Sequence, residues 1–312
     1  MQTGYRRPIG DCKSYNPVRV RFIGAATGSA FARRYLFEAY SRPGAQARFW
    51  GSPCIEEEQK ELIMYNIWLI AKREYKTYFT SPVAYIVTFF LLLALGIVFY
   101  ESLTTAIYYN TSQSQSYAPD ASVILSPLST IFLFTIPALT MRSLPEEQKT
   151  GTFELILTSP VRDAELVIGK WLGAFLFTLT IIAITFILPL ILNRLVTPGI
   201  DMGAAKAGYL GIILTVAAFT AIGIATASLF SNQIAAFFAT VGILLALSLI
   251  GTSTGSSNTT GAIILNFLDI GNHFNSTFIQ GVVQLSDIVY FLSLTILGLF
   301  LGTVSVESRR WR

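Results

Sequence analysis

Six apolar runs interrupt an otherwise polar chain of 312 residues, and none of them contains Asp, Glu, Lys, Arg or His. They cover residues 83–100, 122–141, 171–192, 209–230, 234–250 and 288–304. Runs of about 17–25 apolar residues are long enough to cross the hydrocarbon core of a bilayer as helices. Buried helices of a large soluble protein would instead carry charged positions within each run. The pattern therefore predicts an all-α polytopic membrane protein with six transmembrane helices.

The composition agrees with this class, because the mean hydropathy is +0.57 and only 13% of the residues are charged. The charge-free runs disfavour an ion-coupled carrier and a membrane enzyme, both of which would place ionisable residues at membrane depth. Cys12 and Cys54 both precede the first run, and the single histidine, His273, is expected at the surface. We expect no catalytic, cofactor-binding or metal site in this chain.

Residues 1–63 differ from the rest, because they carry ten Lys or Arg and six Asp or Glu and so supply the whole formal net charge of +4. They have neither the apolar core of a signal peptide nor a sustained helical or strand period. One interpretation is a disordered basic tail near the membrane surface. A second rests on "EEEQKELIM", residues 56–64, which would be encoded by purine-rich codons like those of a bacterial ribosome-binding site.

The second interpretation makes Met64 the natural start, residues 1–63 a non-native extension, and residues 64–312 the transmembrane domain. N-terminal sequencing of the native protein would test this hypothesis, since finding residues 1–63 on the mature chain would refute it.

The basic residues after position 63 predict the orientation through the positive-inside rule. Ten of the twelve fall on one side if both termini are cytoplasmic: Lys72, Arg73, Lys76, Arg142, Lys149, Arg162, Lys170, Arg309, Arg310 and Arg312. The other side receives Arg194 and Lys206 alone. We therefore expect a multi-pass protein of the bacterial inner membrane with both termini in the cytoplasm.

The segment "NIWLIAKREYKTYF" before the first run predicts a helix in the plane of the lipid headgroups. Its helical period puts the aromatic side chains beside a basic face, as in interfacial helices. The residues concerned are Trp68, Lys72, Arg73, Tyr75, Lys76, Tyr78 and Phe79. "TSP", residues 80–82, predicts a break and a new helix start, although a plain continuation of the first span is the alternative.

The polar stretch 143–170 separates the second and third runs and is much the largest loop on the predicted cytoplasmic side. Ser143 and Glu146 match a capping box, and Gly151 and Thr152 divide off a short helix. In that helix Phe153, Ile156 and Leu157 form an apolar face outside the bilayer. This face packs either on the protein's own helix ends or in a groove of a cytosolic partner.

The stretch "TMRSLPEEQKTGTFELILTSPVRDAELVIGK" resembles the cytoplasmic loop of ABC-2 type permeases. The matching residues are Glu146, Glu147, Gly151, Thr152, Glu154, Leu155, Pro160 and Val161. The similarity covers residues 64–312 and is strongest to permeases associated with gliding motility and copper-enzyme maturation. One departure is "QGVVQLSD", with Gln280 and Ser286 where these relatives often carry basic residues.

This resemblance implies that the loop is a coupling helix docked on a separate cytosolic ABC ATPase subunit. Its residues would be Glu146, Glu147, Gly151, Thr152, Phe153, Glu154, Ile156, Leu157 and Pro160. The chain itself contains no G-x-x-x-x-G-K-[ST] phosphate loop, so ATP and Mg are expected on the partner and this chain is not expected to be an enzyme. The resemblance also implies a dimer with a second permease copy or a paralogue.

Two further features predict close helix contacts and short helices on the outer side. Small residues recur at Gly169/Gly173, Ala217/Ala221/Ala225 and Gly298/Gly302, a spacing that lets helices approach closely within one subunit or at a dimer seam. The apolar part of residues 261–283 is too short to cross the membrane and predicts re-entrant or interfacial helices on the outer side, with a plain surface loop as the alternative.

The leading hypothesis is thus the membrane subunit of an ABC exporter, or of a gliding-motility-type envelope complex, embedded in the lipid bilayer with no nucleic-acid partner. The alternative is a membrane anchor that transports nothing. The apolar runs are compatible with lipid, polysaccharide or peptide cargo, so the sequence leaves the substrate open.

Overall fold

The computed structural model describes residues 53–112, 120–146, 162–196, 199–251 and 260–310. The chain divides into two compact units, Met1–Tyr65 and Asn66–Arg312. All regular elements in the described residues are helical, as the sequence predicts. Residues 66–80 of helix α4 belong to the second unit.

Helix α4 spans Pro53–Thr80 and α5 spans Pro82–Ser112, so the predicted break falls at Ser81. Ser81 lies outside both helices, and Pro82 stands at the first position of α5, where its missing N–H costs no hydrogen bond. Helix α6 follows at Ser122–Thr140 and contains Pro127 and Pro137 within its length. The expected change of direction before the first span is therefore present.

The third apolar run forms α9, Asp163–Thr185, which is followed directly by α10, Ile187–Leu195. Helix α11 spans Met202–Leu229 and begins seven residues before the predicted run. Asp201 explains the early start, because its side chain caps α11 by accepting hydrogen bonds from the backbone N–H groups of Gly203 and Ala204. Asn232 caps α12, Gln233–Leu249, in the same way through Ile234 N–H.

The outer segment between the fifth and sixth runs is helical, as expected. It contains α13, Thr260–Leu268, a single turn α14, Ile270–His273, and a π-helical turn η3, Phe274–Phe278. Gly281 adopts a φ of 80° in the turn that leads to α15, Leu285–Arg310. Phe278 packs against Gly211 of α11, so this segment rests on the helix bundle.

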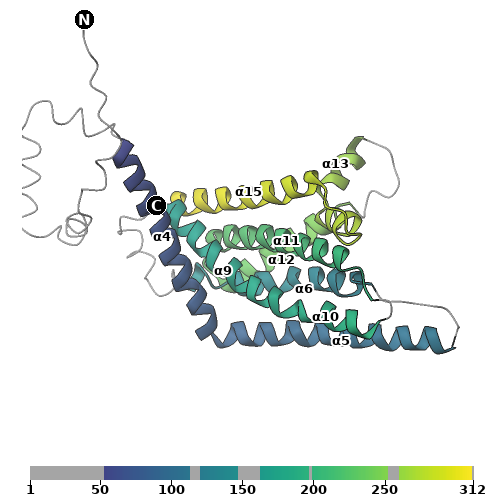
Figure 1. Cartoon of the computed structure of the whole chain (residues 1–312). Coiled ribbons are helices and arrows are strands. Elements are labelled where there is room, and N and C mark those ends of the chain that lie inside the picture. The colour runs from purple at the N-terminus through teal and green to yellow at the C-terminus, as the bar shows by residue number, and fades with distance from the viewer. Residues whose placement is uncertain (1–52, 113–119, 147–161, 197–198, 252–259, 311–312) are drawn as a thin grey trace, which may run out of the picture. The chain divides into compact units, whose positions relative to one another are not determined.

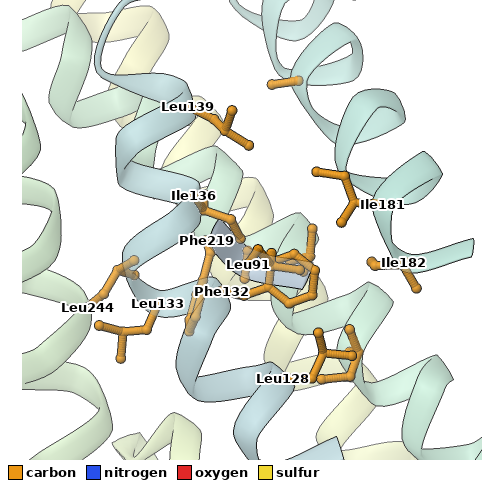
Figure 2. Close-up of a cluster of buried hydrophobic side chains, with 14 of the residues drawn as sticks. Leu91, Leu128, Phe132, Leu133, Ile136, Leu139, Ile181, Ile182, Phe219 and Leu244 are labelled. Carbon is orange, nitrogen blue, oxygen red and sulfur yellow. The ribbon is translucent and has the colours of Figure 1, made fainter. Parts of the chain in front are cut away.

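Helix α11 forms the centre of the bundle and packs against α6, α9, α12, α15 and η3. Figure 1 shows these long helices side by side. Figure 2 shows the core that they share, where Phe132 and Ile136 of α6 lie near Phe219 of α11 and Leu91 of α5. In the most apolar stretch of α11, 83% of the residues are buried, whereas in that of α5 only 17% are buried and large apolar side chains are exposed.

Five helices among the described residues are long and apolar enough to cross a membrane: Pro82–Tyr109, Ser122–Thr140, Asp163–Leu195, Met202–Leu229 and Leu285–Ser308. The fifth apolar run forms α12, a shorter apolar helix of 17 residues that is not among these five. An all-α polytopic membrane protein is confirmed, and the sixth crossing stays a prediction.

The small residues at helix-contact spacing serve packing within the bundle. A Cβ atom on Gly298 would lie 3.0 Å from the backbone of Ala221, and one on Gly302 would lie 3.5 Å from Cα of Ala225. These residues therefore hold α15 close to α11, and the second option, a dimer seam, is not needed to explain them.

Candidate functional site

Polar side chains gather where α4, the end of α6 and the start of α9 meet. We call this group the polar junction and define it as Asn66, Glu74, Ser143, Glu165 and Lys170. It lies on both flanks of residues 147–161, which contain most of the predicted coupling helix. Those residues, with Glu147, Gly151, Thr152, Phe153, Glu154, Ile156, Leu157 and Pro160 among them, fall outside the described residues.

Two glycines of α9 bring α4 into close contact. A Cβ atom on Gly169 would lie 2.7 Å from Cβ of Ile70, and one on Gly173 would lie 2.5 Å from Cβ of Glu74. Real Cβ atoms do not approach this closely, so larger residues at either position would push the two helices apart. The glycine pair thus sets the spacing at which Glu74 and Lys170 meet.

Lys170 is the centre of the polar junction. Its ammonium lies 2.5 Å from a carboxylate oxygen of Glu74 and also donates a hydrogen bond of 2.8 Å to the carbonyl oxygen of Ser143. Only 1% of the lysine side chain is exposed, against 14% for Glu74. A buried ammonium is costly without partners, and here one carboxylate and one carbonyl offset that cost. One side chain therefore connects α9, α4 and the segment after α6.

The upstream flank of residues 147–161 is tied to two other elements through Glu146. Its carboxylate accepts a hydrogen bond of 3.2 Å from the side-chain amide of Gln233, at the start of α12, and lies 3.6 Å from Nε of Arg142. Glu146 belongs to the motif that carries the resemblance described above. It is half exposed, so its ion pair with Arg142 alone adds little stability.

The predicted capping box between Ser143 and Glu146 is not formed. The backbone N–H of Ser143 already donates to Thr140, and that of Glu146 donates to Arg142, so the chain continues in turns from α6. The Ser143 hydroxyl is buried without a hydrogen-bond partner in the structure. A capping box needs free N–H groups at a fresh helix start, and this segment has none at these two positions.

The downstream flank begins with α9 at Asp163. Asp163 and Glu165 occupy the first helical turn, where negative charge is favourable. Glu165 is 4% exposed and accepts a hydrogen bond of 3.1 Å from the side-chain amide of Asn66 on α4. The downstream flank is therefore attached directly to α4, and the upstream flank is connected to α4 through Lys170.

Tyr78 closes the apolar side of this region. Its ring stacks on the ring of Phe177 in α9, with centroids 5.1 Å apart. Phe79 contacts the Phe177 ring edge-on. Burial, followed by the carboxylates of Glu74 and Glu146, raises the pKa of the Tyr78 phenol far above its ordinary value of 10.0. The phenol therefore stays neutral throughout the physiological range.

The residues of the predicted interfacial helix are divided between two environments. Tyr78 is buried and Tyr75 is partly buried, whereas Trp68 and Phe79 are 54% and 41% exposed. Lys72, Arg73 and Lys76 are exposed. Part of the aromatic face thus packs on Phe177 of α9, and the interfacial role of the exposed remainder stays a prediction.

His273 is not the free surface residue that the sequence suggested, because its side chain is only 11% exposed. Nδ1 lies 2.8 Å from a carboxylate oxygen of Asp287, and Nε2 lies 2.8 Å from the carbonyl oxygen of Phe267. Its ring also stacks on Tyr290, with centroids 4.2 Å apart. His273 therefore joins the outer helical turns to α15.

The Lys170–Glu74 ion pair and the His273–Asp287 hydrogen bond were missed from the sequence. Lys170 stands one residue before an apolar run and Glu74 is the single acid in a basic segment, which together indicate a buried pair only once Gly169 and Gly173 are seen to face α4. In the described residues, no group of three or more His, Cys, Asp or Glu side chains is arranged to hold a metal ion.

The helical bundle and its membrane-length helices define a multi-pass membrane protein. The family model described as "ABC-2 family transporter protein" matches residues 68–307, and the chain belongs to this family. The chain is therefore an ABC transporter membrane subunit, as the loop motif suggested. No curated protein matches the chain.

Proposed function

We propose that this chain is the permease subunit of an ABC transporter driven by a separate cytosolic ATPase, which docks on residues 147–161. The family assignment supports the transporter class, and the positive-inside rule supports a cytoplasmic position for this segment. Both termini would then be cytoplasmic, in the inner membrane of a bacterium.

The observation that carries the proposal is the attachment of both flanks of residues 147–161 to the helix bundle. Ser143 and Lys170 link the flanks to α4 and α9, and Glu146 links the upstream flank to α12. A docking segment held at both ends by short polar contacts passes a displacement to those helices rather than absorbing it. The polar junction is therefore the route by which ATP-driven movement would reach the membrane helices.

The contacts in the coupling segment itself stay a prediction from the sequence. Glu154 is expected to set polar register against the ATPase, and the apolar face of Phe153, Ile156 and Leu157 is expected to fill its groove. ATP and Mg would bind to the ATPase subunit. A second permease copy or a paralogue would complete a dimer of membrane subunits. The complex would then use ATP hydrolysis for export or for a gliding-motility-type function in the cell envelope.

Co-purification with the ATPase tests this proposal. The chain and the ATPase are expressed together, and the amount of ATPase retained is compared for the wild type, Glu154→Ala and a matched control, Glu307→Ala. Glu307 is an exposed acid near the end of α15, on the side predicted to be cytoplasmic. We expect Glu154→Ala to lose most of the ATPase and Glu307→Ala to retain it; equal retention by both would contradict docking at this segment.

A further inference from the structure

A pocket lies at the elbow between α4 and α5, at the level where two spans end. It has a volume of about 290 Å³ and is lined by Arg73, Ser81, Ala84, Leu139, Arg142 and Ser143, among others. Residues 73–81 directly precede the span that starts at Pro82, and residues 142–146 directly follow the span that ends at Thr140. The pocket therefore lies at the membrane surface, at the depth of the lipid headgroups.

Two polar groups of this lining are buried without a hydrogen-bond partner, namely Nε of Arg142 and the hydroxyl of Ser143. The Glu146 carboxylate lies 3.6 Å from Nε of Arg142, which is within ion-pair range but beyond hydrogen-bond distance. Buried hydrogen-bond donors in proteins almost always have an acceptor. Where no protein group accepts, a ligand or an ordered water molecule does. Both groups thus leave hydrogen-bonding capacity unused beside one pocket.

The charge around the pocket favours an anionic group. Of its two carboxylates, Glu74 is paired with the buried ammonium of Lys170, and Glu146 lies 3.6 Å from Nε of Arg142, so the region keeps one net positive charge when Lys170 is counted with Arg73 and Arg142. Arg73 is exposed and forms no ion pair with any part of the chain that the structure describes. Two guanidinium groups with free donors remain, and guanidinium groups bind phosphate oxygens well.

The rest of the lining is apolar and belongs to the spans. Val83 and Ala84 fall within the first span, and Ala138 and Leu139 fall within the second. A ligand would therefore meet basic groups at its polar end and apolar side chains toward the bilayer. The volume is near the lower end of ligand pockets, which suits a headgroup and not a whole lipid.

We propose that this pocket binds the phosphate of a membrane phospholipid headgroup, with Arg142, Ser143 and Arg73 as its donors. The phosphate accepts from Nε of Arg142 and from the Ser143 hydroxyl, and the first part of the acyl region lies along Leu139 and Ala84. Such a lipid would fix the elbow between α4 and α5 beside the polar junction. The inference does not depend on the ATPase partner or on the cargo.

Native mass spectrometry of the purified chain tests this proposal. The chain is titrated with phosphatidylglycerol, phosphatidylethanolamine and diacylglycerol, which lacks the phosphate. We expect both phospholipids to bind at one saturable site and diacylglycerol to bind at least tenfold more weakly, on the order of the loss of a charge-assisted hydrogen bond. Inorganic phosphate at millimolar concentration should not displace the phospholipid, because it lacks the apolar part; displacement would contradict a lipid ligand.

Variants separate the pocket from diffuse surface charge. Arg142→Gln should weaken phospholipid binding about tenfold or more, and Ser143→Ala about fivefold. Lys72→Gln is the matched control, because Lys72 is an exposed cation on the same helix that does not line the pocket. Ser143→Ala removes a hydroxyl without a partner and keeps the carbonyl that binds Lys170, so it should fold normally. Unchanged binding in both pocket variants, or an equal loss in Lys72→Gln, would overturn the proposal.

Discussion

The ammonium of Lys170 lies 2.5 Å from a carboxylate oxygen of Glu74, and both residues sit in helices that approach at two glycines. The same ammonium binds the carbonyl oxygen of Ser143, three residues before Glu146 in the family motif. A single buried charge therefore holds together three segments around the predicted coupling helix. Its removal should lower the stability of the protein, and it should also weaken the transmission of movement between these segments.

Breaking the Lys170–Glu74 pair from one side should destabilise the protein. Glu74→Ala removes the carboxylate partner of an ammonium that is 1% exposed, and Lys170→Met removes the ammonium partner of a carboxylate that is 14% exposed. Loss of one partner of a buried pair costs about 3–5 kcal/mol, so we expect a clear fall in Tm for both variants and a larger one for Glu74→Ala. Thermal unfolding in detergent measures this.

The double variant Glu74→Ala/Lys170→Met is the control for that prediction. It removes both charges, so it should be less destabilised than the sum of the two single variants. Additive losses would show that the two side chains do not interact.

Gly173→Ala should separate α4 from α9. The new Cβ atom would lie 2.5 Å from Cβ of Glu74 and 3.0 Å from the carbonyl oxygen of Ala71, so the helices must shift, at a cost of about 1–3 kcal/mol. Gly96→Ala is the matched change, because nothing lies within 4 Å of a Cβ atom there. We expect a lower Tm for the first variant and no loss for the second; equal effects would argue against the close helix contact.

His273→Ala should loosen the outer helical turns from α15. The variant leaves the Asp287 carboxylate, which is 3% exposed, without its imidazole partner, and we expect the free energy of unfolding to fall by about 1–3 kcal/mol. Limited proteolysis of residues 260–283 should also become faster. Asn272 is an exposed neighbour, and Asn272→Ala should change the free energy of unfolding by less than about 0.5 kcal/mol. Equal effects of His273→Ala and Asn272→Ala would refute the role of the His273–Asp287 contact.

The long-range pattern of the chain could be predicted from sequence, whereas its buried polar contacts could not. Charge-free runs indicated the long helices, and Thr80 and Pro82 indicated the break at the elbow, because these depend on neighbours in the chain. The early start of α11 depends on the Asp201 cap, which lies eight residues ahead of the fourth apolar run, 209–230. The pairs of Lys170 and His273 join residues 96 and 14 positions apart, and only helix packing brings them together.

Tyr78 should make the stability of the protein sensitive to high pH. Its folded-state pKa is raised above the ordinary value of 10.0, so the folded protein keeps a proton that the unfolded chain releases. This contribution is complete below pH 10 and is lost as the pH rises above it, by up to about 1.4 kcal/mol per pH unit. Between pH 9 and 11 the Tm of the wild type should fall more steeply than that of Tyr78→Phe, and parallel curves would contradict the prediction.

ATP hydrolysis by the assembled complex tests the central claim most directly, namely that the polar junction passes ATP-driven movement to the membrane helices. The rate is measured for the partner ATPase alone, with the wild-type chain, and with the Glu74→Ala/Lys170→Met chain, after co-purification has shown that equal amounts of ATPase are bound. We predict that the wild-type chain alters the rate of hydrolysis and that the double variant reduces this effect about fivefold or more, in the range of typical coupling energies. A double variant that binds the ATPase and alters its rate as the wild type does would contradict the account.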